Sequence, residues 1–369
     1  MSATGKAFEA AQMRRAQGLV VYDGGLGQNP VLPPKFIVDL VAKALPKTLR
    51  YGSCRGSTEF RAQAVESYGT DRVLTGNGLK PLLYTAQVAF RQLHPTGIIV
   101  HVAPYWPSYG EQTKVAGIET LVVQTAAEDG YKLTAPVLRA ALEPLRDEDG
   151  AARPHLLLFN TPSNPTGAVY DDPELKALAS VLDEFGTTVF LDEIYGQLVH
   201  AEVHSKEVLC VETAPTMVAH YDRCVTGFSL SKVLGAGGLR FGWLVFDETV
   251  ADFYEACCRV AGVTYSAPSP CLEQAGLTVM RRPIQLSHFL QFQQRVFAEA
   301  ALLVMSGLKS IPQIRATCSQ AAWYTLLSFE PARAKLQLRG IETGSVLCKT
   351  LLEETGIVMV PGVAFGMPD

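Results

Sequence analysis

The chain has 369 residues, of which 48% are hydrophobic and 18% charged, and its formal net charge is −4 at pH 7. This composition excludes disorder as the dominant state, and the small acidic excess argues against a nucleic-acid-binding surface. No apolar run approaches the roughly 20 residues that span a bilayer, and the first residues lack the apolar core of a secretory signal. We therefore expect a globular protein with neither a nucleic-acid nor a membrane partner.

The cysteines are scattered along the chain and form no Cys-x-x-Cys pair. They are Cys54, Cys210, Cys224, Cys257, Cys258, Cys271, Cys318 and Cys348. This spacing predicts reduced, mostly buried thiols in a cytoplasmic protein, with neither a disulfide framework nor a metal site.

Short apolar runs alternate with helical patterns in the first two thirds of the chain. In chain order we expect a helix at 79–93, strands at 98–103 and 119–123, a helix at 134–145, a strand at 155–160, a helix at 173–185 and strands at 188–192, 217–221, 225–229 and 243–246. Most of these strands are almost continuously apolar, which is typical of strands buried on both faces of a parallel sheet. The alternation predicts an α/β fold of three layers.

The last third of the chain has a different pattern. We expect a helix at 287–306, a strand at 321–329, a helix at 344–354 and a strand at 357–360. These elements predict a separate, smaller α+β domain, completed by the N-terminal residues. The expected division is a large domain at 46–280 and a small domain formed by 1–45 and 281–369.

Polar residues follow three of the predicted strands, and ligands of open α/β sheets bind beyond the carboxyl ends of strands. The three segments are Asn164-Pro-Thr-Gly, Asp192-Glu-Ile-Tyr195 and Ser229-Leu-Ser-Lys232, the last followed by Arg240. Taken singly, each has an ordinary structural explanation as a turn, a helix cap or a solvated charge. The glycines at 235–242 do not have the strand and helix context of a dinucleotide-binding fingerprint.

Taken together and in this order, the segments resemble the pyridoxal-phosphate (PLP) aminotransferases of the class I/II family, which are aspartate aminotransferase-like and have fold type I. Further matches precede them, at Tyr51 with Gly56, at Gly76-Asn-Gly78 and at Trp106 after Pro104-Tyr. The resemblance covers nearly the whole chain. It implies a mainly parallel, seven-stranded sheet in the large domain and PLP as the cofactor.

The resemblance implies a role for each residue around the cofactor ring. Lys232 would form a Schiff base with PLP and move a proton at the substrate Cα, since lysine alone offers a primary amine. Asp192 would keep the pyridine nitrogen protonated. Asn164 and Tyr195 would hydrogen-bond the phenolic oxygen, and Trp106 would stack on the ring.

The resemblance also implies a phosphate-binding site. It would consist of Gly78 and Leu79 at the start of a helix, the Ser229 hydroxyl and the Arg240 guanidinium, with Tyr51 contributed by the other subunit of a homodimer. Many relatives have a hydroxyl residue in place of Leu79, so we expect only its backbone amide to serve. Lys80 could compensate, although a solvated helix charge is the more common explanation.

The end of the chain departs from the family pattern. The segment Val360-Pro-Gly-Val-Ala-Phe-Gly366 resembles one that relatives follow with an arginine for the substrate carboxylate, and this sequence stops at Asp369. Arg333 and Arg339 do not stand in that position. We expect either a fragment or a chain without this anchor, which would bind amino acids weakly.

The expected activity is that of an aminotransferase (EC 2.6.1.-), which moves an amino group from an amino acid to a 2-oxo acid. One alternative is another PLP reaction on this fold, as in a lyase, decarboxylase or oxidase, since only groups on the substrate side differ. Another is a non-catalytic homologue that lacks the carboxylate-binding arginine. The acyl-transferring branch of the family usually has histidine where this chain has Tyr195, which disfavours that branch.

Overall fold

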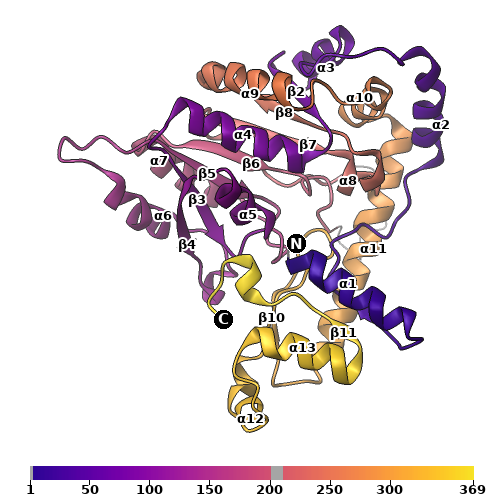
Figure 1. Ribbon diagram of the computed structural model, residues 1–369, viewed down its shortest axis with the longest axis vertical. Helices are drawn as coiled ribbons and strands as arrows, with labels where there is room; N and C mark the ends of the chain where they lie inside the picture. Colours follow the sequence, from indigo (N-terminus) through magenta and orange to yellow (C-terminus); the bar gives the residue numbers. More distant parts are fainter. Residues whose placement is uncertain (1–2, 201–210) are drawn as a thin grey trace.

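A seven-stranded sheet forms the centre of the molecule, whose computed structural model describes residues 3–200 and 211–369 (Figure 1). Its strands are β2 (Val73–Gly76), β3 (Ile98–Ala103), β4 (Glu119–Gln124), β5 (His155–Asn160), β6 (Thr188–Asp192), β7 (Cys224–Ser229) and β8 (Gly242–Phe246). The strand order is β2-β8-β7-β6-β5-β3-β4. Strand β8 runs antiparallel to β2 and β7 on its two sides, and the other neighbouring strands pair in parallel. The prediction of a mainly parallel, seven-stranded sheet is therefore confirmed.

Helices cover both faces of this sheet (Figure 1). On one face lie α4 (Leu79–Leu93), α5 (Ser108–Val115) and α9 (Ala251–Thr264), and on the other lie α6 (Ala135–Leu142) and α7 (Asp172–Glu184). The first core buries Phe90 and Phe253, and the second buries Leu138 and Leu182. Each fully buried side chain of this size contributes roughly 1.5–3 kcal/mol, so both layers are held mainly by apolar burial. The predicted three-layer α/β fold is confirmed.

A third apolar core joins the edge of the sheet to helices from distant parts of the chain. These helices are α2 (Lys35–Ala44), α3 (Thr58–Tyr68), α8 (Leu230–Val233), α10 (Glu273–Arg281) and the start of α11 (Ile284–Leu308). Trp243 of β8 is fully buried there and makes an edge-on contact with Phe60 at 5.9 Å between ring centroids. Helix α2 thus packs on α10, beside the large sheet.

Helix α7 shows how local sequence fixes an element. The Asp171 side chain accepts a hydrogen bond from the Glu174 amide, and the Glu174 side chain accepts one from the Asp171 amide, both at 2.8 Å. Such a capping box satisfies two backbone donors at the helix start and contributes about 1 kcal/mol. Gly186 follows the end of the helix with a φ of +59°, a conformation that glycine adopts without strain.

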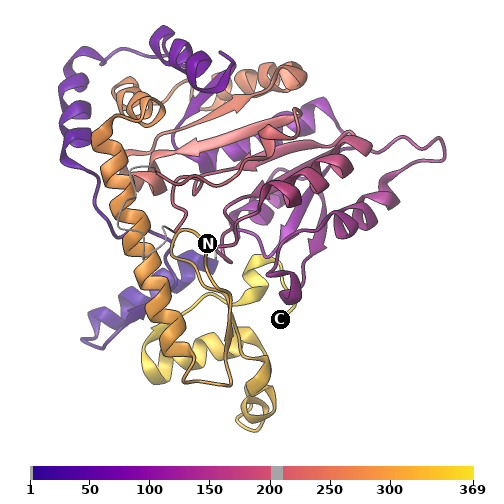
Figure 2. The same cartoon turned by 180° about the vertical axis from the view of Figure 1, so that it is seen from behind.

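Helix α11 leads from the sheet to a smaller lobe, which Figure 2 shows from behind. The lobe contains β9 (Arg315–Ala316), β10 (Leu327–Ser328), α12 (Arg333–Gln337), α13 (Gly344–Thr355) and β11 (Ile357–Val358). The N-terminal α1 (Ala3–Ala16) lies against it, because β1 (Tyr22–Asp23) pairs in parallel with β11. The two ends of the chain are therefore built into one lobe.

Short 3-10 turns join many of these elements. They are η1 (Leu45–Lys47), η2 (Ala127–Asp129), η3 (Glu143–Leu145), η4 (Met217–Ala219), η5 (Gly237–Leu239), η6 (Glu248–Val250), η7 (Pro270–Leu272), η8 (Glu330–Ala332) and η9 (Gly362–Phe365). Within residues 3–200 and 211–369, none of the helices has the length and apolar character that a bilayer span requires.

Two predicted strands are wrong. Residues 217–221 form a helical turn in which the Tyr221 amide donates to the Met217 carbonyl, and these two residues, four apart, are the buried ones. A short apolar run of this kind has no period that separates a turn from a strand. Of residues 321–329 only Leu327 and Ser328 form a strand, and Ala322, with a φ of +56°, interrupts the extended backbone near the start of this segment. The elements that were not predicted are the strands β1, β2 and β9 and the helices α1, α2, α3, α5, α8, α9, α10 and α12.

Candidate active site

A cavity of about 1100 Å³ lies at the carboxyl ends of the central strands, between the sheet and the smaller lobe. Its volume is slightly above the roughly 300–1,000 Å³ that ligand pockets usually occupy. Eight of the ten site residues expected from the sequence line it: Leu79, Trp106, Asn164, Asp192, Tyr195, Ser229, Lys232 and Arg240. Gly78 adjoins Leu79, and Tyr51 does not line this cavity.

The sheet register brings these residues together. Asn160 at the end of β5 is paired with Asp192 at the end of β6, which in turn is paired with Gly227 of β7. Parallel strands end at the same edge of a sheet, so side chains from segments 30 or more residues apart meet at one place. The Asn160 side-chain amide donates a hydrogen bond to the Asp192 backbone carbonyl at 2.8 Å, which links the two strand ends.

Asp192 is a buried carboxylate with ordered donors. Its side chain accepts a hydrogen bond from the Tyr109 hydroxyl at 2.6 Å and one from the Ile194 amide at 3.3 Å. Burial raises its pKa to about 6, against the lowering effect of these donors and of the Lys232 charge. Asp192 is thus ionised near neutral pH, in a place where a negative charge is costly unless a cationic partner is present.

Lys232 lies on the one-turn helix α8, directly after β7. Its ammonium donates to the Gly27 carbonyl, and it lies 6.0 Å from the ring centroid of Tyr195. Burial lowers the pKa of Lys232 to about 8; the nearby Asp192 charge opposes this shift, and the cations Lys80 and Arg240 add to it. At pH 7 about a tenth of the Lys232 side chains are therefore neutral amines, which are nucleophiles and bases, and this fraction rises toward pH 8.

The start of α4 and the Arg240 guanidinium form a cradle at one end of the cavity. Gly78 has a φ of +90°, and a Cβ there would lie 2.5 Å from an Arg240 nitrogen, so the backbone and the guanidinium touch only because Gly78 is glycine. Arg240 donates to the carbonyls of Gly237 at 2.8 Å and Asn77 at 3.2 Å. Backbone amides at a helix start together with a guanidinium are the usual partners of a phosphate group.

The side chains of Leu79 and Ser229 differ in what they offer to this cradle. Leu79 is almost fully buried in the core beneath it, so only its backbone amide can serve a ligand. The Ser229 hydroxyl lies 3.0 Å from both the Phe241 carbonyl and the Ser231 hydroxyl. It is already ordered by the protein, which is the expected state of a preorganised binding group.

Lys80 lines the cavity although its residue surface is largely exposed. Its ammonium lies 4.7 Å from the ring centroid of Trp106, within the range of a cation–π contact. Burial and then the Arg240 charge lower the pKa of Lys80. Among the described residues, Lys80, Lys232 and Arg240 form no ion pair with a carboxylate, so this wall of the cavity suits an anionic ligand.

Tyr195 and Asn164 also line the cavity. The Tyr195 hydroxyl is 2.7 Å from the hydroxyl of Tyr324, and burial raises the pKa of Tyr195 well above its usual range. The Asn164 backbone amide donates to the Asn160 side-chain oxygen at 2.7 Å, which fixes the backbone at Asn164 beside the end of β5. Both residues are almost fully buried.

Tyr51 is the predicted site residue that the structure does not bring into the cavity. It is 98% exposed, in the loop between η1 and α3. A tyrosine this exposed has no packing role within its own chain.

The sequence did not identify Tyr109, Trp323, Tyr324 or the Gly27 carbonyl as site groups. Tyr109 holds Asp192 from α5, and Trp323 and Tyr324 enter the cavity from the segment that was wrongly predicted to be a strand. Tyr109 follows Trp106, a predicted site residue, by three residues, and this spacing was the one feature of the sequence that could have placed Tyr109 near the site. The others depend on the packing of the smaller lobe against the sheet.

The two arginines considered for the substrate carboxylate have other partners. Arg333 pairs with Glu330 at 2.6 Å, and Arg339 pairs with Glu354 at 2.8 Å. All four side chains are more than half exposed, and neither arginine lines the cavity. In addition, the part of the chain that the structure describes contains no group of three or more His, Cys, Asp or Glu residues placed to hold a metal ion.

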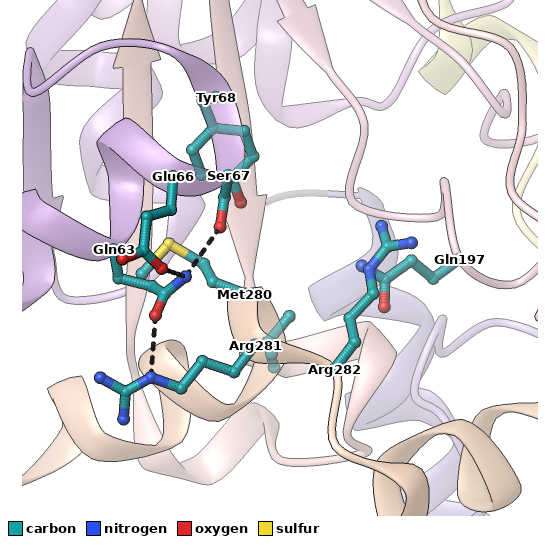
Figure 3. Close-up of a pocket in the computed structure, with 9 residues that line it drawn as sticks. Gln63, Glu66, Ser67, Tyr68, Gln197, Met280, Arg281 and Arg282 are labelled. Carbon is teal, nitrogen blue, oxygen red and sulfur yellow. Dashed lines mark hydrogen bonds between the residues drawn. The ribbon is translucent and has the colours of Figure 1, made fainter.

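A second hollow, of about 610 Å³, lies between α3 and the end of α10 (Figure 3). Gln63, Glu66, Gln197 and Arg282 are among the residues that line it, and the Gln63 side chain accepts a hydrogen bond from Arg281 at 2.8 Å. It contains neither a buried lysine nor a strand-end carboxylate. The first cavity is therefore the candidate active site.

Known proteins with similar sequences are aminotransferases. Residues 23–369 match the family model described as aminotransferase class I and II. The chain is 28% identical to the aspartate aminotransferase of Geobacillus stearothermophilus, over 100% of this chain and 90% of that protein. It is 28% identical to the aspartate/prephenate aminotransferase of Cereibacter sphaeroides, over 100% of this chain and 88% of that protein.

Solved structures show the same fold. The aspartate aminotransferase of Rhizobium meliloti superposes with a TM-score of 0.84 at 23% identity, covering 100% of this chain and 90% of that one. The alanine aminotransferase of Pyrococcus furiosus has a TM-score of 0.82 at 21% identity, with the same coverage. With the family model matched over nearly its whole length, the chain belongs to the class I and II aminotransferase family.

Proposed function

We propose that the protein is a PLP-dependent aminotransferase (EC 2.6.1.-) that moves an amino group from an amino acid to a 2-oxo acid. The observation that carries this proposal is the placement of Lys232, Asp192 and Arg240 around one cavity. An amine, a buried carboxylate and an anion cradle are the three groups that an aldehyde cofactor with a basic ring and a phosphate needs.

The residues of the cavity fit PLP at each of its polar groups. The amides of Gly78 and Leu79, the Ser229 hydroxyl and Arg240 would hold the phosphate. The positive φ of Gly78 and its lack of a Cβ, which let the Arg240 guanidinium come close to the backbone, support this. Asp192 would pair with the ring nitrogen, whose positive charge compensates the cost of burying the carboxylate. Asn164 and Tyr195 would hydrogen-bond the phenolic oxygen, and Trp106 would cover a ring face.

When bound, PLP supplies a carbonyl that condenses with primary amines and a ring that withdraws electrons from the substrate Cα. Lys232 would attach the cofactor and, once freed from it, accept and return a proton at that carbon, a role that its lowered pKa favours. Asp192 would fix the protonation of the ring. Tyr109 would hold the Asp192 carboxylate in place.

We further propose a homodimer in which Tyr51 of each chain reaches the active site of the other. The support is that Tyr51 is 98% exposed and lies outside its own cavity. The proposed domain division is 46–280 for the large domain and 1–45 with 281–369 for the small one, and the pairing of β1 with β11 supports the joining of both chain ends. The free thiols of the described cysteines support a cytoplasmic location, while Cys210 lies outside the described residues.

Aspartate is the first amino acid to test, because several relatives are named as aspartate aminotransferases. The test is to incubate the PLP-loaded chain with aspartate and 2-oxoglutarate and to measure oxaloacetate and glutamate together. Equal amounts of both products are expected from the parent chain, and none from Lys232→Ala. Exposed Lys309, directly after the end of α11, provides the matched Lys309→Ala control, which should keep full activity.

A protein–PLP adduct that borohydride reduces, mapped to Lys232, would confirm the attachment. An equal yield of that adduct at the active site of Lys232→Ala would contradict it. If the adduct forms on Lys232 but no amino acid gives a 2-oxo acid, the cofactor assignment stands and the aminotransferase assignment fails.

A further inference from the structure

Two cysteines from distant parts of the chain meet beside the loop that carries Tyr51. Cys54 lies in this loop, half-buried, and packs on the core formed by α4 and α9. Cys258, on α9, is part of that core, and the side chains of the two residues interact. They are 204 residues apart in sequence (258 − 54), so only the fold brings them together.

Arg55 holds the loop in this position. Its guanidinium forms a bidentate pair with Glu255 of α9 at 2.7 and 3.0 Å, and it lies 4.9 Å from the ring centroid of Tyr254. Tyr254 and Cys258 are one helical turn apart and lie on the same face of α9. The Arg55 guanidinium and the Cys54 thiol pack against that face from the loop.

The two thiols are not equivalent. Cys54 is the more accessible and adjoins the Arg55 charge, whereas Cys258 is only 7% exposed. The pKa of Cys54 is lowered to about 7 by its contact with Cys258, against the opposing effect of burial, with Arg55 contributing further. The contact with Cys54, followed by burial, raises the pKa of Cys258. An accessible, thiolate-prone cysteine next to a buried one is the arrangement of an attacking and a resolving thiol.

We propose that Cys54 and Cys258 form a reversible dithiol–disulfide pair that reacts with hydroperoxides. The Cys54 thiolate attacks one peroxide oxygen, the O–O bond breaks, and the leaving alkoxide or hydroxide takes up a proton. This leaves a sulfenic acid on Cys54. The Cys258 sulfur then displaces the hydroxyl group, which leaves as water with the Cys258 proton, and the disulfide forms. In the net reaction two thiols are oxidised to a disulfide. An organic hydroperoxide is reduced to an alcohol and one water, and hydrogen peroxide is reduced to two waters.

The disulfide would tie the Tyr51 loop to α9. The Cys54 carbonyl accepts the Thr75 amide at 2.6 Å, and Thr75 lies on β2, just before the glycines of the anion cradle. The Tyr265 hydroxyl at the end of α9 donates to the Thr75 carbonyl at 2.9 Å, so loop, strand and helix are already linked around the pair. The modification itself does not depend on the proposed aminotransferase activity.

The test treats the full PLP-loaded chain with about one equivalent of hydrogen peroxide, alkylates the remaining thiols and maps the peptides. We expect a Cys54–Cys258 cross-linked peptide, with an intact mass lower by about 2 Da and restored by dithiothreitol. In the same sample the exposed Cys318 should still react with the alkylating reagent, and Cys257, fully buried beside Cys258, should remain a reduced thiol. Oxidation of Cys318 while Cys54 and Cys258 remain reduced would overturn the proposal.

Three variants separate the roles of the residues. Cys258→Ala should stop at a sulfenic acid on Cys54 that dimedone traps, and Cys318→Ser should leave cross-linking unchanged. Arg55→Gln should slow cross-linking several-fold, whereas Glu255→Gln, which keeps the arginine charge, should slow it less. Accumulation of Cys54 sulfenic acid without a cross-link in the parent chain would show that the two thiols do not act together.

Discussion

Burial of Lys232 and Asp192 in one cavity moves their pKa values toward each other. The pKa of the lysine falls to about 8 and that of the aspartate rises to about 6, and burial is the largest cause of both shifts. Both shifts disfavour the charged forms, so the cavity brings together two groups whose charges are costly to bury. A ligand with a cationic ring nitrogen and a reactive carbonyl would relieve both costs.

Replacing Asp192 with asparagine should have opposite effects on stability and on catalysis. The folded-state pKa of Asp192 is raised, so the parent loses stability as the pH rises from about 4 to about 6, and the loss is complete above that range. Cofactor-free Asp192→Asn should therefore be more stable at pH 8, by on the order of 1–3 kcal/mol, since the raised pKa of Asp192 already includes its attraction to Lys232, and no more stable near pH 4.

Turnover of the PLP-loaded Asp192→Asn variant should fall by two or more decades, since one aimed electrostatic group is worth roughly 3 kcal/mol. Urea unfolding at the two pH values and single-turnover rates would measure the two effects. A variant that is less stable at pH 8, or that turns over within tenfold of the parent, would disagree with the role given to this carboxylate.

Removing the Tyr109 hydroxyl should change the pH dependence of activity. Its hydrogen bond lowers the pKa of Asp192, so Tyr109→Phe should raise that pKa above 6 and move the acidic limb of kcat/KM to higher pH. Tyr170→Phe is the matched control, because Tyr170 is also buried and its hydroxyl accepts the Leu133 amide at 2.6 Å outside the cavity. An equal shift of the acidic limb in both variants would mean that Tyr109 acts only through stability.

At the scale of elements, the start of α4 depends on one glycine. Gly78 has a positive φ and leaves room for Arg240, whereas Gly130 has a φ of +64° with nothing within 4 Å of an added Cβ. Gly78→Ala and Gly130→Ala should each lose about 1 kcal/mol of stability from backbone strain. Only Gly78→Ala should weaken PLP binding by tenfold or more, because the added methyl group displaces the guanidinium. Equilibrium dialysis of PLP would measure this, and equal affinities in the two variants would refute the cradle.

The sequence predicted the parts of the fold that local patterns determine. The buried strands β3 and β5 and the helix α4 were predicted with their observed bounds, since continuous apolar runs and 3.6-residue periodicity are strong signals. Strand β2 has only four residues, and the turn at 217–221 buries two apolar residues four apart, so neither has a local period that identifies it.

The candidate site was predictable where its residues follow strands. Asp192 and Lys232 stand at strand ends, and the parallel register brings such residues together. Tyr109 and Tyr324 could not be found in this way, because their positions depend on how α5 and the smaller lobe pack against the sheet. Long-range packing of this kind leaves no short pattern in one sequence.

At the scale of the whole molecule, the exposed Tyr51 predicts active sites shared between two chains. Mixing Tyr51→Phe chains with Lys232→Ala chains should restore activity, because one site of each hybrid dimer then has both wild-type residues. With equal mixing and random exchange, about a quarter of the sites should recover. Activity that remains at the average of the two separate variants after subunit exchange would mean that each chain supplies its own tyrosine.

Transfer of the amino nitrogen itself tests the central claim most directly. The PLP-loaded chain is incubated with ¹⁵N-labelled aspartate and unlabelled 2-oxoglutarate, and the label is followed by mass spectrometry. The account predicts that the label appears in glutamate, one for each oxaloacetate formed, and that the Lys232→Ala chain transfers none. Label released as ammonia, or an amino acid consumed with release of carbon dioxide or hydrogen peroxide, would contradict the assignment and indicate a lyase, decarboxylase or oxidase.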